Sequence, residues 1–227
     1  MRIDFTDCCV HMISASQFDD FLLTNNTLLT HKVSRSCPNE YYCEKSDTHI
    51  TRYETTSEHI IWCLKLTDFF FFTHTEELID VNRWRVKEIL EYHDDIEWYV
   101  GDVSIADEIR RLAKEQHECE SLPHLLAIYP TALRQHLSDV DAEFRKKETP
   151  ESLFAHAIDK LQPIIYCAQE KYRDARHVRW EDTWELLFTV AKTRRRSGPS
   201  FLPFPIINAY FEKLLVKMKD EWYFLDR

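Results

Sequence analysis

Glycine is the residue that this sequence most obviously lacks. Only Gly101 and Gly198 occur in 227 residues, whereas average usage of about 7% would give roughly sixteen. Folds that depend on many tight turns or positive-φ positions are therefore disfavoured, among them β-sandwiches, β-meanders and nucleotide-binding folds with glycine-rich loops. The scarcity of glycine favours an all-α fold.

Regularly spaced cysteines, a basic excess and long apolar runs are also missing. The seven cysteines form no CxxC pair, so we expect reduced thiols in a cytoplasmic protein rather than a disulfide framework or a structural zinc site. The net charge of −10 argues against a nucleic-acid polymer as partner, and the basic run Lys192–Arg196 is typical of a solvated helix end. The longest apolar run, Phe69–Phe72, is too short to span a membrane, so no membrane partner is expected.

Apolar residues at three- and four-residue steps predict a series of helices. Ser57 is expected to cap a helix whose buried face carries His59, and a later helix should run without a break from about Val81 to Val100 and end at Gly101. The polar, irregular segment 34–56 predicts a loop or a pair of short extended pieces. Further helices are expected at Gln17–Leu29, Ile105–His117, 150–174, Trp180–Lys192 and Ile206–Trp222, with short pieces interrupted at Pro123 and Pro130 over residues 122–137.

The segment EYHDDIEWYVGD, residues 91–102, gathers acidic groups around one histidine. His93 and Asp94 adjoin on the inner face of the expected helix, Glu97 follows on the same side, and Asp102 comes directly after the helix end. Imidazole and carboxylate groups are costly to bury unless they bind something, and together they suit divalent ions such as Mn, Co, Fe or Ni. A solvated acidic helix end is the alternative interpretation.

Two further polar residues stand in apolar helical surroundings elsewhere in the chain, His59 and Asp159. A histidine in such a place is usually a satisfied core residue, and a buried salt bridge would account for the aspartate. Together with His93 and Asp94, however, they give the order His, His-Asp, Asp, each on an apolar helix of its own.

This set of motifs resembles the HD-domain metal-dependent phosphohydrolases and is most similar to their 5′-deoxynucleotidase branch. Ser57-Glu58-His59 matches the first histidine motif, HDxxExxxGD over residues 93–102 matches the central motif, and Asp159 matches the lone aspartate of a later apolar helix. The resemblance covers about residues 18–173. It implies that residues 1–227 form a single compact helical bundle with a metal site at its centre, in which a C-terminal helical extension occupies about residues 180–227.

The resemblance also implies a role for each matched residue. Four side chains would bind one divalent metal ion, with Mn, Co, Fe, Ni and Mg as candidates: His59, His93, Asp94 and Asp159. Glu97 would be a catalytic residue that orients or activates water, or protonates the leaving oxygen. Asp102 would contact the sugar of the substrate or help to hold the water.

The resemblance implies, in addition, an arginine upstream of the first histidine that binds the substrate phosphate. Arg35 matches this position, but the segment between Arg35 and His59 is longer than in the family pattern, and Ser36 and Cys37 replace an aromatic residue. Arg52, which is closer to His59, is therefore a competing candidate.

The implied function is hydrolysis of (deoxy)nucleoside 5′-monophosphates to nucleoside and phosphate by a cytoplasmic enzyme that forms a homodimer. One alternative is another HD-domain reaction, including a diiron oxygenase to which His117 and His124 would supply extra ligands. The other is a catalytically inactive HD interaction module. Pro163 cannot donate a hydrogen bond to the carbonyl of Asp159, so we expect a bend in the helix that directs Asp159 at the metal.

Overall fold

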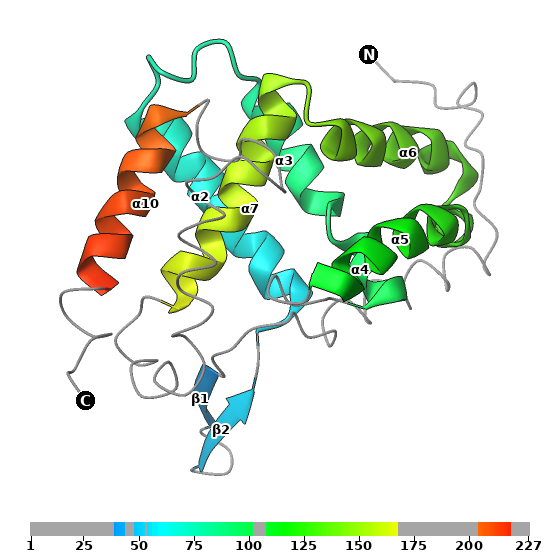
Figure 1. Ribbon diagram of the computed structural model, residues 1–227, viewed down its shortest axis with the longest axis horizontal. Coiled ribbons are helices and arrows are strands. Elements are labelled where there is room, and N and C mark those ends of the chain that lie inside the picture. The colour runs from blue at the N-terminus through cyan, green and yellow to red at the C-terminus, as the bar shows by residue number, and fades with distance from the viewer. Residues whose placement is uncertain (1–38, 44–47, 53, 102–107, 168–203, 219–227) are drawn as a thin grey trace, which may run out of the picture.

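The computed structural model describes residues 39–43, 48–52, 54–101, 108–167 and 204–218, with the elements arranged as in Figure 1. These elements are β1 (Asn39–Cys43), β2 (Thr48–Arg52), α2 (Thr56–Thr73), α3 (Arg83–Tyr92), α4 (Asp95–Val100), α5 (Glu108–Ile128), α6 (Thr131–Lys146), α7 (Pro150–Cys167) and α10 (Pro205–Met218). The expected all-α class is confirmed, and antiparallel β1 and β2 are the pair of extended pieces expected between residues 34 and 56. The helices expected at Gln17–Leu29 and Trp180–Lys192 lie outside the described residues.

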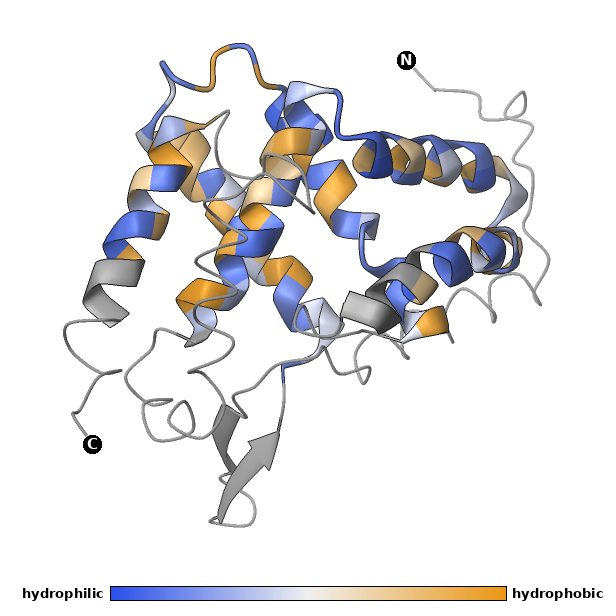
Figure 2. Cartoon of the chain, viewed as in Figure 1, coloured by the Kyte–Doolittle hydropathy of each residue, from blue (hydrophilic) through white to orange (hydrophobic). Residues whose placement is uncertain are grey.

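Helix α7 is central to the core because it contacts α2, α3, α6 and α10. Phe154 and Ile158 of α7 are fully buried and belong to one apolar cluster with Phe70 of α2 and Ile207 of α10. Apolar residues alternate with polar ones along these helices in Figure 2, as expected where each helix buries one face. No helix among the described residues is long and apolar enough to cross a membrane.

Helix α2 begins two residues earlier than a cap at Ser57 would require, so that prediction was wrong. Thr55 is the N-cap, and its hydroxyl oxygen accepts a hydrogen bond from the Glu58 backbone N–H at 3.3 Å. The Glu58 carboxylate in turn accepts from the Thr55 backbone N–H at 2.9 Å. This capping box pairs two N–H groups that a helix start otherwise leaves without partners, and it fixes the first turn, on which His59 follows.

The single helix expected from Val81 to Val100 is two helices in the structure. α3 ends at Tyr92, α4 begins at Asp95, and Asp94 between them has φ −100° and ψ 0°. Apolar spacing does not reveal this break, because buried residues continue at helical intervals on both sides of it. Neighbouring side chains in a regular helix point about 100° apart. The break therefore changes the relative direction of the His93 and Asp94 side chains.

The glycine and proline positions agree only in part with expectation. Gly101 ends α4 with φ +84° and ψ 150°, so the residue has the positive φ expected of glycine but not the left-handed helical ψ. Pro123 was expected to interrupt a helix and does not: α5 continues to Ile128, and both Pro123 and Cys119 are exposed, so water can satisfy the carbonyl that loses its partner. Pro130 does separate α5 from α6.

Helix α7 starts at Pro150 as expected, with Glu151 in its first turn. It stays helical through Pro163 to Cys167. The bend at Pro163 stays a prediction, as does the single domain over residues 1–227.

Candidate metal centre

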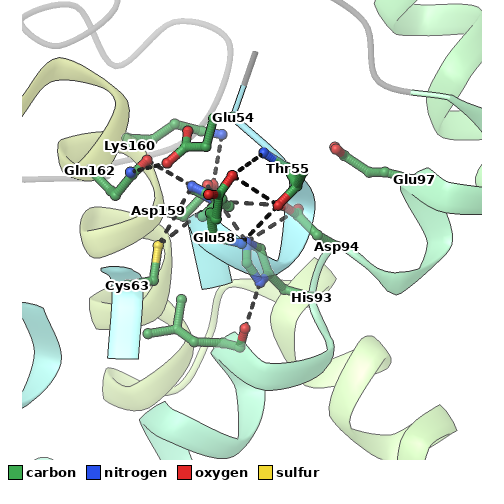
Figure 3. Close-up of polar contacts among 12 residues, drawn as sticks. Glu54, Thr55, Glu58, Cys63, His93, Asp94, Glu97, Asp159, Lys160 and Gln162 are labelled. Carbon is green, nitrogen blue, oxygen red and sulfur yellow. Dashed lines mark hydrogen bonds and ion pairs between the residues drawn. The ribbon is translucent and has the colours of Figure 1, made fainter. Parts of the chain in front are cut away.

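Three parts of the fold bring the four predicted metal ligands together. His59 comes from α2, His93 and Asp94 come from the break between α3 and α4, and Asp159 comes from α7. The helices α2, α3 and α7 contact one another in all three pairs. Figure 3 shows the resulting cluster of side chains, which we call the HHDD cluster.

The distances within the HHDD cluster suit a small cation between His59, His93 and Asp159, whose ligand atoms all lie within 4.8 Å of one another. His59 Nε2 lies 3.5 Å from Asp94 Oδ2 and 3.3 Å from Asp159 Oδ1. His93 Nε2 lies 3.2 Å from Asp94 Oδ1 and 3.6 Å from Asp159 Oδ1. Nitrogen and oxygen ligands about 2.1 Å from one ion lie roughly 3 Å from one another. All four residues are buried, so the cluster is a preformed set of donor atoms rather than a loose surface group.

Each histidine is held by a hydrogen bond at the ring nitrogen that faces away from the cluster. His59 Nδ1 lies 2.7 Å from Gln162 Oε1, and His93 Nδ1 lies 2.9 Å from the carbonyl oxygen of Leu90. Because both partners are acceptors in these contacts, Nδ1 carries the hydrogen in each ring and Nε2 presents its lone pair. His93 Nε2 is buried without a hydrogen-bond partner. This is the state expected of a nitrogen that binds a metal ion, so the donor set fits a divalent cation.

The two acids create a field that favours a positive charge in the cluster. Burial alone would lower the pKa of His93, but the charges of Asp94 and Asp159 outweigh it and raise that pKa to about 9. Burial would likewise raise the pKa of Asp159, yet the Lys160 charge and the close contacts with the two histidines hold it well below its usual value. A field that favours a proton on imidazole equally favours a metal cation at the same atom.

Gln162 and Glu54 form a chain of hydrogen bonds that holds the His59 ring of the HHDD cluster. Neither residue was identified from the sequence. Gln162 Nε2 donates to Glu54 Oε1 at 2.7 Å while the amide oxygen holds His59. Both residues are almost fully buried. The available signal was the presence of Gln162 in an otherwise apolar stretch of α7, one turn after Asp159. Such partners orient a ligating histidine and increase its basicity.

Glu97, the predicted proton-transfer residue, lies on α4 and is anchored by charges from α5 and α6. Lys114 Nζ lies 2.6 Å from Glu97 Oε1 and 3.4 Å from Glu118 Oε1, and Glu118 Oε2 lies 3.0 Å from an Arg145 guanidinium nitrogen. The side chains of Glu97, Lys114 and Glu118 are less than a fifth exposed. This series of ion pairs holds the Glu97 carboxylate in one place. The sequence spacing of these charged residues did not predict the ion pairs.

A second buried contact ties the start of α4 to the chain after α5. The Tyr129 hydroxyl donates to the Asp95 carboxylate. Burial raises the pKa of Asp95 to about 7, even though the hydrogen bond from Tyr129 and the charge of His93 act in the opposite direction. Because Asp95 directly follows Asp94, this contact helps to fix the backbone of the break between α3 and α4.

The remaining predicted site residues are not brought to the HHDD cluster by the described structure. Arg35 and Asp102 lie outside the described residues, and Arg52 is the last residue of β2, where only its backbone is described. His117 and His124 are exposed on α5. Within the described ranges, the group of side chains able to hold a metal ion includes neither of these two histidines.

Comparisons with known proteins agree with this geometry. A family model described as "HD domain" matches residues 44–196. Relatives named 5′-deoxynucleotidase HDDC2 are 28% identical over 87 residues in Danio rerio (38% of this chain, 44% of the relative) and 27% identical over 97 residues in Homo sapiens (43% and 47%). The chain therefore spans about half the length of the curated relatives it matches.

A solved structure has a similar fold. It comes from Magnetospirillum magnetotacticum and is described as a "predicted metal-dependent phosphohydrolase"; the alignment gives a TM-score of 0.61 at 20% identity and covers 89% of this chain and 95% of the other. The matched family segment contains all four residues of the HHDD cluster. With two thirds of its length matched by the family model, the chain belongs to the HD-domain family.

Proposed function

We propose that this protein is a metal-dependent phosphohydrolase that converts (deoxy)nucleoside 5′-monophosphates to nucleoside and phosphate. The observation that carries the proposal is the HHDD cluster, in which ligand atoms of His59, His93 and Asp159 lie within 4.8 Å of one another, Asp94 contacts both histidines, and His93 Nε2 has no hydrogen-bond partner. The substrate class is supported by the relatives named 5′-deoxynucleotidase.

In this proposal His59, His93, Asp94 and Asp159 hold one divalent ion, with Mn, Co, Fe, Ni and Mg as candidates. The ion would supply polarisation of the substrate phosphate and activation of water for attack on phosphorus. Four protein donors would leave one or two positions of an octahedral ion open for water and a substrate oxygen. The buried hydrogen bonds at both Nδ1 atoms keep these donors in place through the reaction.

Glu97 is the proposed proton carrier. Its carboxylate is held by Lys114, and in Figure 3 the Glu97 side chain points toward the HHDD cluster. It would accept a proton from the attacking water or deliver one to the leaving 5′-oxygen. Asp102 is proposed to contact the sugar or hold the water, and Arg35 or Arg52 to bind the phosphate. A cytoplasmic location and a homodimer stay predictions.

The test combines metal analysis with a phosphate-release assay over ribo- and deoxyribonucleoside 5′-monophosphates. We expect about one divalent ion per chain, turnover that depends on Mn or Co, and loss of both metal and turnover in Asp94→Ala. Asp139→Ala removes an exposed carboxylate from α6 and serves as the matched control, expected to behave as the wild-type protein. Full turnover in Asp94→Ala would contradict the assigned site. Metal binding with no hydrolysis of any phosphate ester would favour an inactive interaction module.

A further inference from the structure

Lys160 has an unusual position for a residue next to a proposed metal ligand. Adjacent side chains of a helix point about 100° apart, so Lys160 should diverge from Asp159. Instead its Nζ lies 2.7 Å from Asp159 Oδ2, and Figure 3 shows its nitrogen directed toward the HHDD cluster. The Lys160 side chain is 40% exposed whereas that of Asp159 is 12% exposed. The ammonium group therefore lies where the buried cluster meets solvent.

The two oxygens of Asp159 face different partners. Oδ1 faces His59 Nε2 at 3.3 Å and His93 Nε2 at 3.6 Å, so this oxygen points to the centre of the HHDD cluster. Oδ2 faces Lys160. The ammonium group is thus separated from the centre of the cluster by the width of one carboxylate. A phosphate group is of similar size, so a phosphate with one oxygen bound to an ion at the centre could place another oxygen on Lys160.

The charge balance of the HHDD cluster explains why a phosphate ligand would require an additional cation such as the Lys160 ammonium group. A divalent ion would balance Asp94 and Asp159, and Glu97 is already paired with Lys114. A phosphate monoester dianion would then enter a site without surplus positive charge, in a chain whose net charge is −10. Among the residues that the structure describes, Lys160 is the cation paired directly with a residue of the cluster. Its charge would make the site attractive to the dianion.

We infer that Lys160 is a phosphate-binding residue that contacts a non-bridging oxygen of the substrate phosphate from α7. The inference deepens the proposed function and rests on it, since it takes a phosphate monoester as the ligand. It adds a phosphate contact on α7 to the arginines upstream of His59. Lys160 is not a metal ligand and acts only through its charge and its N–H donors.

The test uses the full chain loaded with Mn²⁺ and measures two affinities. The affinity for inorganic phosphate is obtained from ³¹P relaxation by the bound Mn²⁺, and the affinity for Mn²⁺ itself is obtained by calorimetry on metal-free protein. In Lys160→Met we expect phosphate affinity to fall about tenfold or more, because a charge-assisted hydrogen bond is lost. Mn²⁺ affinity should be unchanged or higher, because removal of a nearby positive charge favours another cation. Lys160→Arg should restore most of the phosphate affinity.

Lys65→Met is the matched control, because Lys65 is exposed on α2 and the variant changes the net charge equally. It should leave both affinities as in the wild-type protein. Unchanged phosphate affinity in Lys160→Met, or a loss of Mn²⁺ affinity in that variant, would overturn the inference, since the second result would mean that Lys160 only holds Asp159. If the wild-type protein releases no phosphate from nucleoside monophosphates but Lys160→Met still weakens phosphate binding, the proposed substrate fails and the role of Lys160 stands.

Discussion

His156 on α7 should make the stability of this protein sensitive to mild acid. The ring is buried, it stacks on Phe144 with centroids 3.8 Å apart, and its Nε2 donates to the Phe144 carbonyl at 2.7 Å. Burial, assisted by the charge of Lys147, lowers the pKa of His156 to about 3, although the bond to the Phe144 carbonyl acts in the opposite direction. The folded protein therefore holds this imidazole in its neutral form.

The size of the effect follows from the difference between the folded and unfolded states. In the unfolded chain a histidine takes up a proton near its ordinary pKa of 6.5, whereas folded His156 does not do so until about pH 3. Above pH 6.5 His156 is neutral in both the folded and the unfolded state, so it does not affect stability. As the pH drops from 6.5 toward 3, only the unfolded chain takes up the proton, and the free energy of unfolding falls. Each pH unit corresponds to about 1.4 kcal/mol, so the loss at pH 5 is about 2 kcal/mol.

The measurement is urea unfolding at pH 7.5 and pH 5.0 in the presence of EDTA, for the wild-type protein and for His156→Gln. Other titrating groups contribute equally to both proteins, so the wild-type protein should lose about 2 kcal/mol more between the two pH values than the variant. His117→Gln, which removes an exposed histidine from α5, should match the wild-type loss. Equal losses in the wild-type protein and His156→Gln, or an NMR titration of His156 near pH 6.5, would refute the reasoning.

Two further predictions concern residues that support the site. Gln162→Leu removes the acceptor for His59 Nδ1 and should lower the Mn²⁺ affinity measured by calorimetry about 10- to 100-fold. The control Gln135→Leu changes an exposed residue of α6 and should leave the Mn²⁺ affinity unaltered. Equal Mn²⁺ affinities of Gln162→Leu and the wild-type protein would show that the hydrogen bond is dispensable. Lys114→Met removes the 2.6 Å contact of Lys114 with the Glu97 carboxylate and should lower kcat for phosphate release about tenfold or more, with KM and Mn²⁺ affinity little changed and with recovery in Lys114→Arg; an unaltered kcat would contradict a positioning role.

The sequence predicted the helical fold because apolar spacing is a strong local pattern, whereas the joint HHDD ligand set was implied only by the resemblance to a known family. Apolar spacing placed His59 and Asp159 on buried helix faces, and the resemblance to the HD-domain family related them to His93 and Asp94. The start of α7 at Pro150 followed from its capping and proline signals.

The sequence did not predict features that depend on backbone detail or on contacts between distant helices. The spacing of apolar residues does not reveal the helix break at His93–Asp94, because the same helical spacing continues on both sides of the break. The pairing of Lys114 with Glu97 and of Gln162 with His59 joins different helices, and lysine and glutamine are common enough that neither stands out. Lys160 could not be assigned because helix geometry alone directs it away from its neighbour.

The origin of the four cluster residues in three separate parts of the fold has a thermodynamic consequence. A bound cation would act as a cross-link between segments as distant in the chain as His59 and Asp159, and it would relieve the repulsion between two buried carboxylates. A metal that binds only the folded chain shifts the folding equilibrium by mass action, by about 2.7 kcal/mol at a free concentration 100 times its Kd. Chelation would therefore reduce the amount of folded protein as well as its turnover, and the abundance of the protein in a cell would follow the supply of free metal.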